Sequence, residues 1–157
     1  MSSNIINLLW ESFLETILMV GVSGGLGAAI GIPLGVFLFV TSPKGIMPKP
    51  YVNRIIGTVV NAVRSTPFII LLVAIIPFTR LIVGSSIGTV AAIVPLTIAA
   101  APLIARLVET SLREVDKGLI EAAQSMGATN TQIICKVLIP EAMPGILAGL
   151  TIAFVAL

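Results

Sequence analysis

The residues EAAQSMG at 121–127 and VLIP at 137–140 belong to one of the few stretches of this chain that are not long, uncharged and apolar. The stretch lies between two segments whose composition suits the interior of a lipid bilayer. Polar groups must therefore leave the bilayer here and form a compact structure in water before the chain re-enters. We expect a water-exposed pair of short helices between two membrane spans.

The first of these helices is predicted from Val115 to Met126. Its apolar residues Leu119, Ala123 and Met126 follow the spacing of one helical face. Asp116 can cap its start, where a carboxylate meets free N–H groups and the positive end of the helix dipole. Gly127 stands where a helix ends in a left-handed residue, a conformation that glycine adopts without steric cost.

The second helix is predicted to open with Thr129 and Gln132, which have the spacing of a capping box. Pro140 removes a backbone donor, so we expect it to limit how far this helix continues unbroken. Each helix is too short to be stable alone in water. The apolar side of the second helix consists of Ile133, Ile134, Val137 and Leu138.

The spacing of this stretch is also that of a known loop. Permease subunits of bacterial ABC importers carry the pattern E-A-A, three residues, G, nine residues and I-x-L-P, and this chain resembles it with Val and Ile in place of Ile and Leu. The resemblance implies two coupling helices that dock in a groove of an ATP-binding subunit; the alternative is a chance helix-turn-helix between two spans. The matching residues are Glu121, Ala122, Ala123, Gly127, Val137, Ile139 and Pro140.

The composition indicates a membrane protein. Of 157 residues, 57% are hydrophobic and only 10% are charged, whereas soluble domains are about 25% charged. The mean hydropathy is +1.12. A net charge of +2 without a basic patch argues against nucleic acid as a partner. The lone cysteine, Cys135, is interpreted as packing filler.

No catalytic chemistry is predicted for this chain. It has no histidine, no phosphate-binding glycine loop, no metal-ligand cluster and no nucleophile–base pair. We therefore expect no cofactor or metal on this chain and ATP hydrolysis on another one.

The fold class predicted is all-α, a single polytopic transmembrane domain over residues 1–157. The spans are expected at about 16–40, 58–76, 87–107 and 145–157, after an amphipathic segment at 1–15 that lies along the interface. Thirteen residues in the last span reach only about 20 Å of a core about 30 Å thick. We expect the chain to be cut off within its fourth span, as an incomplete version of a longer protein.

The first span is rich in glycine, which lets a neighbouring helix approach to backbone distance. Pro33 should bend it. The sequence leaves open whether the neighbour belongs to the same subunit or to a second copy. The glycines that share the G-x-x-x-G spacing, at 21/25, 27/31 and 31/35, are Gly21, Gly25, Gly27, Gly31 and Gly35.

Positive charge orients the chain. The loop at 42–54 carries Lys44, Lys49 and Arg54, which predicts a cytoplasmic position. The loop at 77–86 is then outside, the coupling loop at about 114–140 is inside, and the amino terminus is outside. Since no basic residue precedes Lys44, we expect no cleavable signal peptide. The predicted location is the bacterial inner membrane.

The entry to the second span is unusually polar, with Asn61, Arg64, Ser65 and Pro67. Arg64 can snorkel to the basic side of the membrane. Alternatively, an arginine beside a proline break lines a pathway or gate, because the break frees backbone carbonyls. Both interpretations stay open.

Four further strings, at 64–72, 76–80, 92–97 and 101–106, are similar to the permease family of bacterial methionine importers. The resemblance covers nearly the whole chain. It implies the type I importer fold, a permease homodimer, two ATP-binding subunits with ATP and Mg²⁺, and an extracytoplasmic methionine-binding lipoprotein. The cargo implied is L-methionine and also D-methionine. The alternatives are another amino acid as cargo, or a truncated membrane fragment that transports nothing.

Overall fold

A computed structural model describes residues 2–157, with side chains from Ile5 onward. The described residues are helical and contain no strand, so the all-α prediction is confirmed. The elements are α1 (Ser2–Val40), α2 (Pro50–Ser65), α3 (Phe68–Val83), α4 (Thr89–Arg113), α5 (Lys117–Ser125), α6 (Asn130–Ile133), a π-helical turn η1 (Ile134–Leu138) and α7 (Ile139–Ala156).

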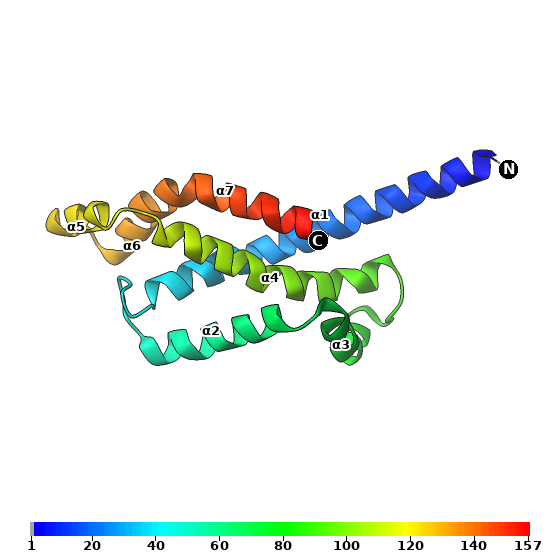
Figure 1. Ribbon diagram of the computed structural model, residues 1–157, viewed down its shortest axis with the longest axis horizontal. Helices are drawn as coiled ribbons and strands as arrows, with labels where there is room; N and C mark the ends of the chain where they lie inside the picture. The colour runs from blue at the N-terminus through cyan, green and yellow to red at the C-terminus, as the bar shows by residue number, and fades with distance from the viewer. Residues whose placement is uncertain (1) are drawn as a thin grey trace.

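Helix α4 is the centre of the bundle. It packs against α1, α7, α3 and α2, and Figure 1 shows α7 and α2 on opposite sides of it. The short helices α5 and α6 extend from one end of the bundle, and the first half of α1 extends beyond the other helices at the opposite end. Among the described residues, three helical stretches are long and apolar enough to cross a membrane, and a bent pair is a fourth candidate.

The seam between α1 and α4 is built from three glycines spaced four residues apart. A Cβ on Gly27 would lie 2.7 Å from the Ala100 side chain, and one on Gly31 would lie 2.7 Å from the Ala101 carbonyl oxygen. A Cβ on Gly35 would lie 2.5 Å from the Ala105 carbonyl oxygen and 2.8 Å from Cβ of Val108. The backbones can approach this closely only because these positions lack side chains. Gly21 and Gly25, by contrast, have no neighbour within 4 Å.

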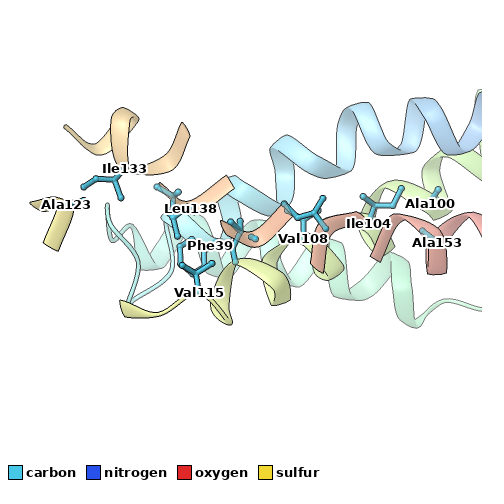
Figure 2. Close-up of a cluster of buried hydrophobic side chains, with 13 residues drawn as sticks. Phe39, Ala100, Ile104, Val108, Val115, Ala123, Ile133, Leu138 and Ala153 are labelled. Carbon is cyan, nitrogen blue, oxygen red and sulfur yellow. The ribbon is translucent and has the colours of Figure 1, made fainter. Parts of the chain in front are cut away.

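The core is a single row of buried side chains that continues beyond the long helices. Ile104, Val108 and Leu112 of α4 begin the row, and it ends at Ile133 of α6 and Ala123 of α5. Figure 2 shows this row passing from the bundle into the short helices. The short helices therefore pack on the same core as α4 and α7.

Two expected boundaries differ from the structure at the start of the chain. The amphipathic segment and the first span form one helix, which has 39 residues. It measures about 58 Å at 1.5 Å per residue, well above the roughly 30 Å of a bilayer core. The sequence has no turn-forming residue between the segments, and the helix continues through Pro33.

The second expected span is broken. Helices α2 and α3 meet at Thr66 and Pro67 with a bend of 111°. The residue before a proline avoids the helical region, and Thr66 accordingly has φ −80° and ψ 126°. Helix α2 also starts earlier than expected, at Pro50, and α3 continues through Pro77 to Val83. The third span lies within α4, which continues six residues past the expected end at 107.

Pro140 does not interrupt the helix, which corrects the expectation from the sequence. The residues from 130 to 156 are continuously helical, and the fourth span begins in α7 before the expected start at 145. A proline ring clashes with the carbonyl four residues earlier in an α-helix. Here the turn directly before Pro140 is π-helical, and the Ile139 N–H bonds to the Ile134 carbonyl. The wider turn accommodates the ring.

Candidate functional site

The candidate site is a corner formed by α5, α6 and η1, here called the corner element and defined as residues 116–140. Its first helix is capped as predicted, because the Gly118 N–H donates to Oδ1 of Asp116 at 2.8 Å. A side-chain cap of this kind stabilises a helix by about 1 kcal/mol. A nine-residue helix has few other stabilising contacts of its own. The cap therefore matters for whether α5 forms.

Gly127 makes the turn. Its φ of +79° lies in the left-handed region, as the sequence predicts. The Gly127 N–H donates to the Gln124 carbonyl at 2.9 Å, and the Ala128 N–H donates to the Ala123 carbonyl at 3.1 Å. These two bonds form a Schellman motif. A residue with a Cβ would be strained at this position.

The second helix starts with the predicted capping box. The Thr129 N–H donates to Oε1 of Gln132 at 2.9 Å. The Gln132 N–H donates back to Oγ1 of Thr129 at 3.4 Å. Gly127 is only two positions before the cap residue Thr129, so the glycine and this cap together set the direction of the chain.

The π turn determines which side chains face the core. Ile133 and Leu138 are five residues apart, and their exposed fractions are 0% and 1%. In an α-helix, residues five apart point about 140° away from each other. The extra residue in the π turn brings both onto the same side, where they pack with α4 and α7 in the core cluster.

The residues of the E-A-A pattern divide between the core and the surface. Ala123 is buried, and Val137 and Ile139 are half-buried. Glu121, Ala122 and Gly127 are exposed, and Pro140 is exposed as well. The exposed surface of the corner element also carries Met126, which is 82% exposed. The element thus has an inner apolar side and an outer side that is free within this chain.

The loop after α1 supports α5, a contact that the sequence did not reveal. Residues 41–49 fold back on the end of α1, where the Met47 N–H donates to the Val40 carbonyl at 3.0 Å. Ile46 of this loop and Ile120 of α5 pack on the same core. Between them lies an open pocket of about 220 Å³, also lined by Lys44, Lys117 and Glu121.

The four polar residues proposed for a pathway lie at the break between α2 and α3. Asn61, Arg64, Ser65 and Pro67 are all exposed within this chain. In an α-helix, positions 54, 58, 61 and 65 fall on one side. Arg54, Thr58, Asn61 and Ser65 therefore form a polar stripe along α2, and each is exposed. Arg64 lies off the stripe, on the side that carries Gly57 and Val60.

A charge cluster at the end of α4 was not predicted as a unit; its glutamate is buried, whereas Arg106 is half-buried and Arg113 is exposed. Glu109 is 4% exposed. Its Oε2 accepts from Nη1 of Arg106 at 2.5 Å, and its Oε1 accepts from Nη2 of Arg113 at 2.6 Å. From the sequence, no site is predicted between the expected end of the third span at 107 and the coupling loop that starts at about 114. The spacing 106, 109 and 113 on one helical face was the available signal.

Arg106 also links α4 to α2. Its Nη2 donates to the Gly57 carbonyl at 3.0 Å. Its Nε is buried and has no hydrogen-bond partner among the residues that the structure describes. In the same described part of the chain, the two ion pairs to Glu109 are the only salt bridges. No group of three His, Cys, Asp or Glu residues there has a metal-binding arrangement.

Comparison with known proteins gives the family. The family described as binding-protein-dependent transport system inner membrane component matches residues 27–157. The chain is 56% identical to a probable D-methionine transport system permease protein of Vibrio cholerae, over 96% of this chain and 67% of that protein. It is 53% identical to the D-methionine transport system permease protein of Escherichia coli K12, over 100% of this chain and 72% of that protein.

A solved structure agrees with this match. Inward-facing conformations of the MetNI methionine ABC transporter include a chain that is 52% identical and superposes with a TM-score of 0.96. The superposition covers 99% of this chain and 72% of that chain. The helices, the bend between α2 and α3 and the corner element described above are thus those of an importer permease. This chain belongs to the family of inner-membrane components of binding-protein-dependent transport systems.

Proposed function

We propose that this chain is the membrane-spanning subunit of an ATP-driven importer that carries methionine, in its L- and D-forms, into the cytoplasm. The names of its relatives in Vibrio cholerae and Escherichia coli support the permease role and D-methionine as a cargo. In the proposed assembly two copies of the permease bind two ATP-binding subunits. ATP and Mg²⁺ are held by those subunits, and a methionine-binding lipoprotein delivers the cargo from outside.

The distribution of charge supports a cytoplasmic position for the corner element. Lys44 of the basic loop lines the pocket against α5, and Lys49 belongs to the same loop. The basic loop and α5 therefore lie at the same end of the bundle. Arg80 lies near the end of α3, where the chain turns toward α4. Basic residues favour the cytoplasmic side of a membrane. The outer side of the corner element would then face the ATP-binding subunit, and the amino terminus would lie outside.

The observation that carries the proposal is the shared core. Ala123, Ile133 and Leu138 of the corner element pack in one cluster with residues of α4 and α7. Packed interiors transmit displacement because they have little free volume. When the ATP-binding subunits close, a push on the exposed Glu121–Ala122 side would therefore move α4 and α7 with the corner. The residues proposed to couple to the ATP-binding subunit are the exposed Glu121, Ala122, Gly127 and Pro140, which would dock, and Ala123, Val137 and Ile139, which would connect them to the core.

A route for the cargo is proposed along α2. The stripe of Arg54, Thr58, Asn61 and Ser65 offers hydrogen-bonding groups in a segment that otherwise suits lipid. The break at Pro67 leaves backbone groups that need polar surroundings. If the stripe lines an aqueous passage, water can solvate both its polar side chains and the backbone groups at the break. Arg64 is proposed as a gate residue beside the break, and a snorkelling role remains its alternative.

A different amino acid is the alternative cargo. Uptake competition would separate the two, because a methionine importer should be blocked by excess unlabelled L-methionine and D-methionine. Polar amino acids at the same concentration should leave uptake unchanged. Competition by a polar amino acid but not by methionine would reject methionine as the cargo.

The coupling role is tested by Gly127→Pro in the permease assembled with its ATP-binding subunit in membrane vesicles. Proline fixes φ near −65° and has no N–H, so it removes both the left-handed turn and the bond to Gln124. Uptake per complex should fall at least tenfold while ATP hydrolysis continues. Membrane insertion should remain intact, because Gly127 precedes the candidate span that begins at Asn130.

Gly84→Pro is a matched control. Gly84 also has a φ of +79° and ends a helix, α3, and its N–H donates to the Arg80 carbonyl. The backbone change is therefore the same, but it occurs away from the corner element. Equal uptake losses in the two variants, or normal uptake in Gly127→Pro, would contradict the coupling role.

A further inference from the structure

Helix α2, which carries the polar stripe, packs only weakly against the rest of the bundle. Among its residues only Gly57 and Val60 are buried. Its polar contacts to other helices come from two places. At its start, Nδ2 of Asn53 donates to the Leu38 carbonyl at 2.6 Å and to Oγ1 of Thr41 at 3.1 Å. One turn later, the Gly57 carbonyl accepts from Arg106 of α4.

The carbonyl that Arg106 contacts is next to the proposed passage. In an α-helix the carbonyl of residue 57 closes the turn with the N–H of residue 61. The guanidinium therefore bonds to the turn that presents Asn61 in the polar stripe. A shift of Arg106 would move this turn, and with it the stripe, relative to α4.

Arg106 is itself held in place. Glu109 uses one oxygen for Arg106 and the other for Arg113, and its side chain is only 5% exposed. A guanidinium has a rigid fork of donors, so one Arg106 can bond Glu109 through Nη1 and Gly57 through Nη2 at once. Lysine has no such fork and could not reproduce both contacts with one geometry.

The cluster is poorly explained by stability alone. Burying the charged carboxylate of Glu109 is costly, and well-packed apolar residues often stabilise a protein as much as or more than a buried ion pair does. Arg106 also leaves its buried Nε unpaired among the described residues. The cluster costs free energy and leaves one donor without a hydrogen bond, yet it joins the core helix α4 to the weakly packed helix α2. These properties are those expected of a contact that fixes the position of α2.

We propose that Arg106, oriented by Glu109, is a positioning residue that fixes the register of the α2 polar stripe by binding the Gly57 carbonyl. The proposal rests on the proposed function, because it assigns Arg106 to the transport path. It makes no assumption about which amino acid is the cargo. Arg106 does not contact cargo in this arrangement and acts through α2.

The first test reads the position of α2 without using transport. Asn61→Cys is introduced together with Cys135→Ser, so that position 61 carries the only thiol, since Cys135 is the sole cysteine of the chain. The assembled complex in vesicles is treated with a water-soluble maleimide. Arg106→Gln should change the rate at position 61 at least threefold. A cysteine at Lys49, before α2 begins, should react at an unchanged rate.

Gly57→Ala approaches the same contact from the other side and keeps every charge. A Cβ on Gly57 would lie 3.3 Å from Nη2 of Arg106, which is close enough to displace the guanidinium slightly. The rate at position 61 should change in the same direction as in Arg106→Gln, by about twofold. This variant keeps the test informative if Arg106→Gln folds poorly.

The second test measures transport by complexes that have assembled. Arg106→Gln should raise the methionine concentration for half-maximal uptake and the ATP hydrolysed per methionine, each at least fivefold. Arg106→Lys should be intermediate. Arg113→Gln, which leaves the Gly57 bond intact, should keep at least half of the wild-type uptake.

The two tests separate the two claims. If maleimide rates respond but no wild-type uptake of methionine occurs, the positioning role holds and the proposed cargo fails. If the rates at position 61 match those of the wild type in both Arg106→Gln and Gly57→Ala, the positioning role is overturned. A variant that only lowers the amount of complex, with normal rates and uptake per complex, likewise overturns it.

Discussion

Helices α1 and α2 both pack on α4, but the two contacts are built differently. The α1 contact is a seam of glycines that press against the backbone of α4 at Ala101 and Ala105. The α2 contact has few buried side chains and is held by the bond from Arg106 to Gly57. A close-packed seam resists separation along its whole length. Helix α2, by contrast, is held by that bond and by the Asn53 bonds to the end of α1, and it can move where one of these anchors fails. The difference suggests one rigid body and one adjustable helix.

The largest expected effect tests whether the corner element belongs to the rigid body. Ile133→Ala removes a fully buried side chain that joins the corner to the core. The free energy of unfolding should fall by about 3–4 kcal/mol, the range for a large-to-small change in a packed core. Thermal or denaturant unfolding of the purified permease in detergent would measure it.

Ile152→Ala is the control for that variant, because Ile152 is 58% exposed. Its loss should change the free energy of unfolding by less than about 1 kcal/mol. A small effect at both positions would separate the corner from the core and would weaken the argument that it moves α4 and α7.

The next effect tests the glycine seam. Gly31→Val introduces a branched side chain whose Cβ alone would lie 2.7 Å from the Ala101 carbonyl oxygen. Overpacking of this kind should destabilise the permease by about 2–3 kcal/mol. Gly25→Val is matched in chemistry and lies on the same helix, but nothing lies within 4 Å of a Cβ there. Similar melting temperatures for the two variants would show that the seam is not tightly packed.

The smallest effect tests the adjustable helix. Asn53→Ala removes both bonds from the start of α2 to the end of α1, worth about 1–2 kcal/mol together. Amide hydrogen exchange should quicken about five- to thirtyfold in α2 and stay unchanged in α1 and α4. Asn61→Ala, at an exposed position on the same helix, should leave exchange as in the wild type. Uniform quickening across all helices would mean that α2 is part of the rigid body.

Much of the corner element could be predicted because its signals are local. A cap, a left-handed glycine and a capping box depend on bonds between residues a few positions apart, so Asp116, Gly127 and Thr129 were identified correctly. The all-α class followed from composition in the same way. The prediction that Pro140 limits the helix was wrong. The local rule that a proline stops an α-helix does not take account of a π turn directly before the proline.

Other features depend on which helices meet, and a single sequence does not contain that information. Five glycines in α1 look alike in the sequence, but only Gly27, Gly31 and Gly35 of those five face α4 closely. The bond from Arg106 to Gly57 joins residues 49 positions apart. The break at Thr66–Pro67 was anticipated from the proline, but its angle and the length of α3 were not.

The π turn also has a consequence for how this segment tolerates change in length. Residues 134–138 hold one residue more than an α-helix would need to align Ile133 with the inner row of α7. Loss of one residue here would convert the π turn to an ordinary α-helix. Ile133 before the turn and the buried side chains of α7 after it would still face the core. Gain of one residue would rotate the corner away from the bundle. The segment is therefore a place where a shorter variant of the chain could arise without altering the surface offered to a neighbour.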